Sequence, residues 1–213
     1  TASGGPFIDY NLNDLKRVNA NDAIQHPTWN MGKKISVDSS TMMNKGLEII
    51  EAKTLFNLDI NNIKAIIHRQ SKIHAFVEFF DGTIISHMSN PDMRIPISYA
   101  ITYPKRMYSD KKGDFSYENF SFEEVNCDKF PCYRLARKVA EMGKNTGLIL
   151  NAANEISVEY FLKDKISYLD IPNIIEDILD SGDVVEHDTL DSIIENDKEI
   201  RELTRNYIKT RYS

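Results

Sequence analysis

Cysteine is scarce in this sequence, and long apolar runs are missing from it. The two cysteines, Cys127 and Cys132, are separated by four residues. Two thiols are too few for the disulfide framework of a small secreted domain, and no Cys/His pair elsewhere completes a zinc site. We therefore expect two reduced thiols in a cytoplasmic protein. No apolar stretch approaches the roughly 20 residues that a membrane-spanning helix needs, so we expect no membrane partner.

A secretory signal is also missing. The first residues, TASGGPFIDY, contain neither a basic region nor an apolar one. The chain opens on Thr1 within a glycine turn rather than on Met, so we expect either a mature end or a missing N-terminal part. The net charge of −6 argues against a general nucleic-acid binder. The 213 residues, 41% hydrophobic and 27% charged, are typical of a soluble globular protein with one large or two small domains.

The first half of the chain mixes helical and strand-like patterns. An apolar stripe predicts a helix over residues 41–56, and Asn19 is a suitable N-cap for a short helix that ends at Gln25. A further helix is expected within NPDMRIPISYAIT, although Pro96 weakens that prediction.

Two β-rich runs, IKAIIHRQ and IHAFVEFF, lie between these helices. Asp81-Gly82 follows the second run and precedes TIISHM. Because glycine tolerates the positive φ of a tight turn, this dipeptide predicts a β-hairpin.

The second half begins with an aperiodic polar stretch and then becomes helical. Residues 103–128 show no periodicity and are predicted to be a linker. Amphipathic patterns then predict four helices with short connections, over the ranges 131–143, 147–162, 172–182 and 189–211. We predict an α+β fold: a mixed-sheet domain with flanking helices at 1–102, the linker at 103–128, and a four-helix bundle-like domain at 129–213.

One stretch, DSSTMMNKGLEIIEA, gathers residues that could hold an anion and a cation. Asn44, Glu48 and Glu51 are spaced i, i+4, i+7 and share one helix face. Lys45 adds a positive charge, and Ser39 is expected just before the helix, where hydroxyls and free backbone N–H groups favour anions. A divalent cation at Glu48 would remove its repulsion of a phosphate. The alternative is a solvated helix face with no ligand.

Three other stretches have a functional and a structural interpretation. Ser3 precedes two glycines, which could form a backbone nest for an anion or a plain tight turn. HPTWNMGKK places His26, Trp29 and Gly32 in a loop that could be a closing flap or a surface loop with one anchoring tryptophan. His74 could line a site or be a satisfied core histidine.

Taken together, four motifs resemble one enzyme family. TASGGPF, HPTWNMGKKISVDSSTMMNKGLEIIEA, NPDMRIPI and LNAANE resemble, in this order and across essentially the whole chain, the 1-deoxy-D-xylulose 5-phosphate reductoisomerases. The resemblance implies a homodimeric, cytoplasmic NADP-dependent oxidoreductase and isomerase of the methylerythritol phosphate route to isoprenoids. Such an enzyme converts its sugar-phosphate substrate to 2-C-methyl-D-erythritol 4-phosphate with NADPH and a divalent cation (Mg, Mn or Co).

The resemblance also implies that parts of the enzyme lie outside this chain. Family members begin with a Rossmann-type NADPH domain and an Asp-Ser-Glu stretch that supplies two metal ligands, and neither is found here. On this reading residues 1–102 are the catalytic domain without its first segment. The fragment alone is then expected to be inactive.

Roles carry over to the positions that match the family motifs. The substrate phosphate is expected to bind Ser3, Ser39, Asn44 and Lys45. Glu48 is expected to be the remaining metal ligand and, with His26, to contact substrate and act in catalysis. Gly32 is expected to approach the cofactor, Glu51 to support the metal ligands, and Met93 to line the site.

Two departures from the family and two rival functions remain. Arg69 stands where many members have proline, and DSST replaces the commoner DSAT. The first rival is a non-catalytic phosphate-binding and dimerisation module. The second is an unrelated sugar-phosphate isomerase, which the absent cofactor domain favours and the MMNKGLE motif opposes.

Overall fold

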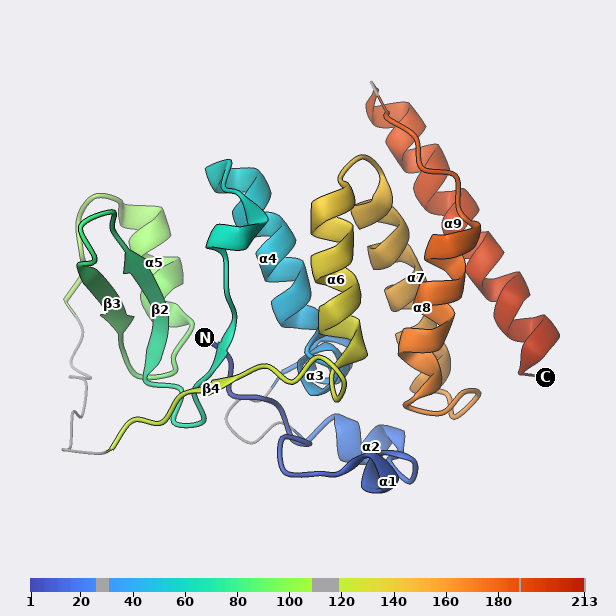
Figure 1. The fold of residues 1–213 in the computed structure, drawn as a ribbon, viewed down its shortest axis with the longest axis horizontal. Helices are drawn as coiled ribbons and strands as arrows, with labels where there is room; N and C mark the ends of the chain where they lie inside the picture. Colours follow the sequence, from blue (N-terminus) through green and yellow to red (C-terminus); the bar gives the residue numbers. More distant parts are fainter. Residues whose placement is uncertain (26–30, 109–118, 188, 213) are drawn as a thin grey trace. The chain divides into compact units, whose positions relative to one another are not determined.

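The computed structural model of the chain describes residues 1–25, 31–108, 119–187 and 189–212 (Figure 1). Its contacts group the chain into two compact units, which are described separately. One unit joins Thr1–Ser3 to Ile66–Glu124, and the other joins Gly4–Ala65 to Val125–Ser213. These units differ from the expected division at residues 102 and 128. The reason is that a helix from the first half of the chain packs among the C-terminal helices.

The smaller unit contains short strands and one helix. Strands β2 (Ile73–Glu78) and β3 (Ile84–Met88) form an antiparallel hairpin in which Val77 lies opposite Ile85. Gly82 in the connecting turn has φ +82°, which confirms the hairpin predicted from Asp81-Gly82. Helix α5 (Arg94–Thr102) is also confirmed.

The expected mixed sheet is reduced to two small antiparallel sheets in the described residues. Of the run IKAIIHRQ only β1 (Ile66–Ile67) is a strand; it pairs antiparallel with β4 (Glu123–Glu124) and forms one parallel bridge through Ala2. The predicted linker therefore contributes a strand. The guanidinium of Arg69 lies 2.9 Å from the carboxylate of Glu123 in β4, in an exposed ion pair beside the β1–β4 pairing.

The larger unit begins with two single-turn helices, α1 (Leu12–Leu15) and α2 (Ala20–Ala23). Each has a complete capping box, in which an asparagine and an aspartate satisfy backbone N–H groups that have no intrahelical acceptor. Asn19 caps α2 as predicted. A 3₁₀ turn, η1 (Ile60–Asn62), closes this half of the unit.

The helix predicted over 41–56 is in fact the second of two consecutive helices. Helix α3 spans Lys33–Ser40 and α4 spans Met43–Phe56. Met42 joins them in the left-handed region, at φ +61°. The α3 helix was missed because its buried face is largely polar (Ser36, Asp38 and Ser40, with Val37).

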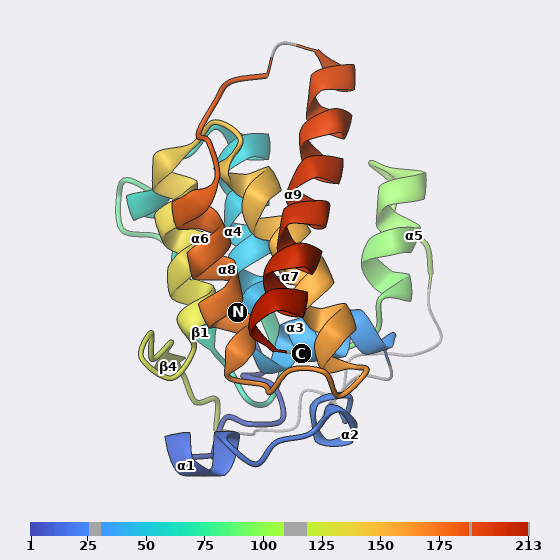
Figure 2. The same ribbon diagram turned by 90° about the vertical axis from the view of Figure 1, so that its right-hand side faces the viewer.

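Four helices follow: α6 (Pro131–Met142), α7 (Thr146–Phe161), α8 (Asp170–Ser181) and α9 (Leu190–Arg211). They pack on one another, with α7 in contact with α6, α8 and α9, and α4 packs on α6 (Figure 2). Their buried faces are apolar side chains of α6, α7 and α8, whose removal from water is the main stabilising term. The predicted four-helix arrangement and the α+β class are confirmed. Within the described residues no helix is both long and apolar enough to cross a membrane.

Candidate functional site

The first two turns of α4 bring three predicted site residues together. The side-chain amide of Asn44 donates to Glu48 Oε1 at 2.7 Å, and Lys45 Nζ lies 2.5 Å from Glu48 Oε2. Both contacts follow from helix geometry, since residues three and four apart lie on one face. The predicted face is therefore formed, with each oxygen of the Glu48 carboxylate engaged by a different donor.

Burial differs between the members of this ion pair. The Glu48 side chain is 46% exposed, whereas that of Lys45 is 17% exposed. An ion pair within one helix and open to water stabilises a protein by about 0.3–0.5 kcal/mol. The pair between Lys45 and Glu48 therefore adds little to the stability of the fold.

Ser39 occupies a different place from the one expected. It lies in the last turn of α3 rather than before the start of α4. The hydroxyl of Ser40 donates to Val37 O at 2.7 Å, and that of Thr41 accepts from Met43 N at 3.3 Å. These two hydroxyls are therefore already engaged, whereas Ser39 is half-buried. The expected place of Ser39, just before the start of α4, is therefore wrong, while its role in binding an anion stays a prediction.

The glycine turn lies directly against this joint. Gly4 and Gly5 have φ of +91° and +69°. A Cβ built at Gly5 would lie 2.6 Å from Ser39 O, closer than real Cβ contacts. Only glycine therefore fits both the conformation and the space at position 5. The turn is confirmed, while its use as an anion nest stays a prediction.

The remaining predicted residues that the structure describes are exposed or half-buried. Gly32 is the exposed N-cap of α3, Glu51 is exposed one turn beyond Glu48, and Met93 is the exposed N-cap of α5 in the smaller unit. Ser3 also belongs to the smaller unit. His26 and Trp29 lie outside the described residues, so the flap stays a prediction.

The donor set suits only part of a metal site. A carboxylate oxygen is the ligand that hard divalent cations prefer, and Glu48 presents one that is half exposed. In the described part of the chain, however, no group of three or more His, Cys, Asp or Glu side chains could hold an ion. The described residues around Glu48 thus offer one carboxylate ligand and no complete metal site.

His74 is held by the backbone of the smaller unit. Its Nε2 lies 3.1 Å from Ser89 O, and burial lowers the pKa of the imidazole. This favours the structural interpretation of His74 in the present chain.

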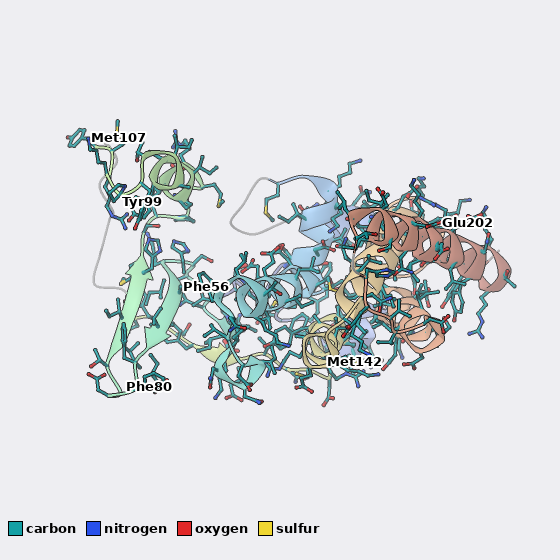
Figure 3. The ribbon with its side chains drawn as sticks, turned by 90° about the horizontal axis from the view of Figure 1, so that it is seen from above. Phe56, Phe80, Tyr99, Met107, Met142 and Glu202 are labelled. Carbon is teal, nitrogen blue, oxygen red and sulfur yellow. The ribbon has the colours of Figure 1, made fainter. Side chains whose placement is uncertain are left out.

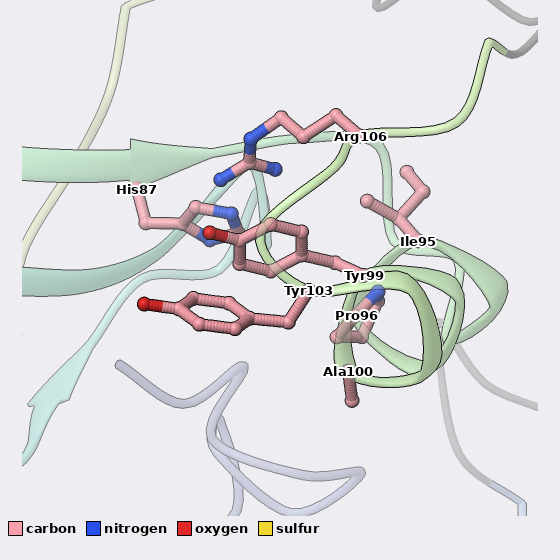
Figure 4. Close-up of a pocket in the computed structure, with 7 residues that line it drawn as sticks. All are labelled: His87, Ile95, Pro96, Tyr99, Ala100, Tyr103 and Arg106. Atoms are coloured by element: carbon pink, nitrogen blue, oxygen red, sulfur yellow. The ribbon is translucent and has the colours of Figure 1, made fainter.

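The same unit has an open cleft of about 560 Å³ between the hairpin and α5 (Figure 4). The Arg106 guanidinium stacks on the Tyr99 ring there at 4.1 Å, beside His87 and Tyr103. No predicted site residue lines this cleft.

Sequence reasoning missed a buried polar contact behind Ser39. The carboxylate of Asp38 accepts from the side-chain amide of Asn154 at 2.9 Å and is paired with Lys34 at 2.7 Å. Asp38 stands in the DSST motif and Asn154 in the LNAANE motif. The available signal was a charged residue directly after Val37, at a helical position that the periodicity buries.

Comparison with known proteins gives one consistent result. The family described as DXP reductoisomerase C-terminal domain matches residues 88–203, and the 1-deoxy-D-xylulose 5-phosphate reductoisomerase C-terminal domain matches residues 1–56. The 1-deoxy-D-xylulose 5-phosphate reductoisomerase of Clostridium perfringens (strain 13 / Type A) is 46% identical over 100% of this chain and 55% of its own length. That of Caldanaerobacter subterraneus is 46% identical over 98% of this chain and 56% of its own length.

Solved structures agree. A crystal structure of DOX-P reductoisomerase in complex with NADPH, fosmidomycin and magnesium matches with a TM-score of 0.91 at 40% identity, over 98% of this chain and 54% of that one. The enzyme from Zymomonas mobilis in complex with NADPH matches with a TM-score of 0.90 at 37% identity, over 97% and 53%. The chain thus spans about half the length of its relatives, and it belongs to the 1-deoxy-D-xylulose 5-phosphate reductoisomerase family.

Proposed function

We propose that this chain is the substrate-phosphate and metal-ligand part of a reductoisomerase that converts 1-deoxy-D-xylulose 5-phosphate to 2-C-methyl-D-erythritol 4-phosphate with NADPH and a divalent cation. The observation that carries the proposal is the cluster of Asn44, Lys45 and Glu48 on α4. It lies within the residues that match the family, and it contains one donor pair for an anion and one carboxylate for a cation.

Ser39, Asn44 and Lys45 are proposed to bind the phosphate together with Ser3. In the present chain the donors of Asn44 and Lys45 both point at Glu48. A phosphate, with about two negative charges, competes for these donors better than one exposed carboxylate. The grip is remote from the reacting carbons, so its binding energy can orient them in the transition state.

Glu48 is proposed to become a metal ligand when Lys45 turns to the phosphate. The exchange leaves each charge paired: the ammonium with phosphate, the carboxylate with the cation. When bound, the cation acts as a Lewis acid toward the substrate carbonyl and the adjacent hydroxyl. Without that exchange, Glu48 would share its oxygens with two donors and bind a cation weakly.

The other expected roles complete the proposal. His26 is proposed to contact substrate, Gly32 to approach the nicotinamide and Met93 to line the site. A Rossmann-type NADPH domain outside these residues would supply the cofactor site. A non-catalytic phosphate-binding module would also use Asn44 and Lys45 of the α4 cluster, but it gives no function to the half-exposed carboxylate of Glu48.

A metal titration of the complete gene product separates these two functions. Glu48→Gln keeps the side-chain volume and the contact with Asn44 but removes the anionic oxygen. We expect metal affinity to fall at least tenfold and kcat to collapse, while the KM for the sugar phosphate changes little. The matched control is Glu141→Gln, an exposed glutamate in α6, which should leave all three values unchanged. Equal metal affinity of Glu48→Gln and wild type would remove Glu48 from the site.

A homodimer is the proposed assembly. Support comes from the β2–β3 hairpin, on which Val77 and Ile85 are 56% and 58% exposed and Phe80 is fully exposed at the turn (Figure 3). Exposed apolar patches of this kind mark contact surfaces. Sedimentation should give a dimer for wild type and a monomer for Ile85→Lys, and a dimer that survives this change places the contact elsewhere.

A further inference from the structure

Asp38 is a buried carboxylate with partners on two helices. It is 1% exposed. One oxygen accepts from Asn154 of α7 at 2.9 Å, and the other is paired with Lys34, one turn earlier on α3, at 2.7 Å. The Asn154 contact joins positions 116 residues apart in the sequence, so it ties the C-terminal turn of α3 to the middle of α7.

Burial is the largest influence on the pKa of this carboxyl, which is raised above its usual value. Burial raises its pKa, while the Lys34 ammonium and the Asn154 amide oppose that rise. Glu155, next to Asn154, adds repulsion, although Arg201 pairs with Glu155 at 2.7 Å. An amide donor at position 154 therefore favours the charged form of Asp38, whereas a carboxylate there would repel it.

The residue on the other side of Ser39 is anchored too. Ser40 is fully buried, and its carbonyl accepts from the Tyr168 hydroxyl at 2.7 Å. Tyr168 lies in the connection between α7 and α8 and is 5% exposed. Ser39 is thus a half-buried residue between two neighbours that are each tied to the C-terminal helices.

We propose that Asn154 and Tyr168 are positioning residues of the phosphate site, which they serve by fixing the Asp38–Ser40 backbone so that Ser39 presents its hydroxyl in one place. The proposal rests on the proposed phosphate role of Ser39. It gives the LNAANE motif a function at a distance from the substrate.

The amide of Asn154 supports a positional role over a purely stabilising one. Its nitrogen donates to Asp38, but its oxygen is buried without a partner within the described ranges. A buried polar group left unsatisfied destabilises a fold. An apolar pair at positions 38 and 154 would avoid that loss, and it would also release the end of α3.

The test is steady-state kinetics of the complete gene product. Asn154→Ala removes the donor to Asp38, and Tyr168→Phe removes only the hydroxyl that binds Ser40 O. Both should raise the KM for the sugar phosphate at least fivefold and leave the KM for NADPH and the metal affinity unchanged. A variant that merely folds less well has fewer active molecules, which lowers the apparent kcat. It does not raise the KM for the sugar phosphate while leaving the KM for NADPH unchanged.

Matched controls come from the same helix. The Asn151 side chain donates to Glu155 at 3.3 Å, and the Ser157 hydroxyl donates to Ala153 O at 2.7 Å, both within α7. Asn151→Ala and Ser157→Ala should leave both KM values unchanged.

The outcomes separate the two proposals. If Asn154→Ala does not fold, Tyr168→Phe decides, because it keeps the ring and its packing. Turnover by wild type with an unchanged sugar-phosphate KM in Tyr168→Phe would overturn the positioning role alone. No turnover by wild type would remove the proposed function and the positioning role with it.

Discussion

The contact between α4 and α6 is close enough to predict the effect of one methyl group. A Cβ built at Gly46 would lie 2.4 Å from the Cβ of Ala136, while its next neighbours, in Cys132 and Tyr133, are at 3.8 Å. Carbon atoms pack at about 3.5–4.0 Å. Gly46→Ala therefore meets a single obstacle, which the two helices can relieve only by moving apart about 1 Å.

The free energies can be worked out for both single variants. Overpacking of this kind costs about 1–3 kcal/mol, offset by about 1 kcal/mol because alanine is a better helix former than glycine. Gly46→Ala should thus lower the free energy of unfolding by about 0–2 kcal/mol. Ala136→Gly should lower it by about 2 kcal/mol, from helix propensity and one buried methyl group.

The double variant distinguishes a specific clash from general damage. Gly46→Ala with Ala136→Gly moves one methyl group across the interface, and the two helix-propensity changes cancel. Its stability should lie within about 1 kcal/mol of wild type, although the single losses sum to about 2–4 kcal/mol, a coupling expected only of residues in contact. Urea unfolding of the 213-residue chain, followed by circular dichroism, measures all four. Additive losses would refute the close approach of α4 and α6.

Three further predictions concern the site and the thiols. In the complete gene product, Lys45→Ala should raise the KM for the sugar phosphate strongly and lower kcat as well, because binding energy at the phosphate orients the substrate; an unchanged KM removes Lys45 from the pocket. The 213-residue chain by itself should not oxidise NADPH with the sugar phosphate, and turnover by this purified chain would contradict the assignment of two metal ligands to residues outside it. Iodoacetamide should label the half-buried Cys127 but not Cys132 in the folded chain, because Cys132 is buried and burial raises its thiol pKa to about 12. Mass spectrometry after labelling in buffer and in urea checks this. Labelling of Cys132 in buffer would contradict its burial.

The parts of the fold that follow from local rules were predicted well. The four C-terminal helices and the hairpin have apolar periodicity or a specific turn dipeptide, and both signals are local. Asn19 was found as an N-cap because the capping pattern is contained within four residues. The Asn44, Lys45 and Glu48 cluster followed from helix spacing alone.

What was missed depends on contacts far apart in the sequence. The break between α3 and α4 occurs at Met42, which has a positive φ although methionine has no preference for it. Burial of the Met42 side chain holds the backbone in this conformation. Local rules look for glycine at such a point. Likewise, the strand at Glu123–Glu124 has no β-rich pattern of its own; it forms against β1, where Arg69 can pair with Glu123. The Asp38–Asn154 bond joins two motifs whose proximity only the folded chain provides.

The joint at Met42 also bears on how this chain withstands oxidants. Peroxide converts methionine to a polar sulfoxide, which disrupts a packed interior. Met42 and Met43 are only 2% and 0% exposed, whereas Met93, Met107 and Met142 are 57%, 65% and 44% exposed (Figure 3). A mild oxidant should therefore react with the three exposed methionines first. Met42 and Met43, at the turn between α3 and α4, should be oxidised only once the helices open.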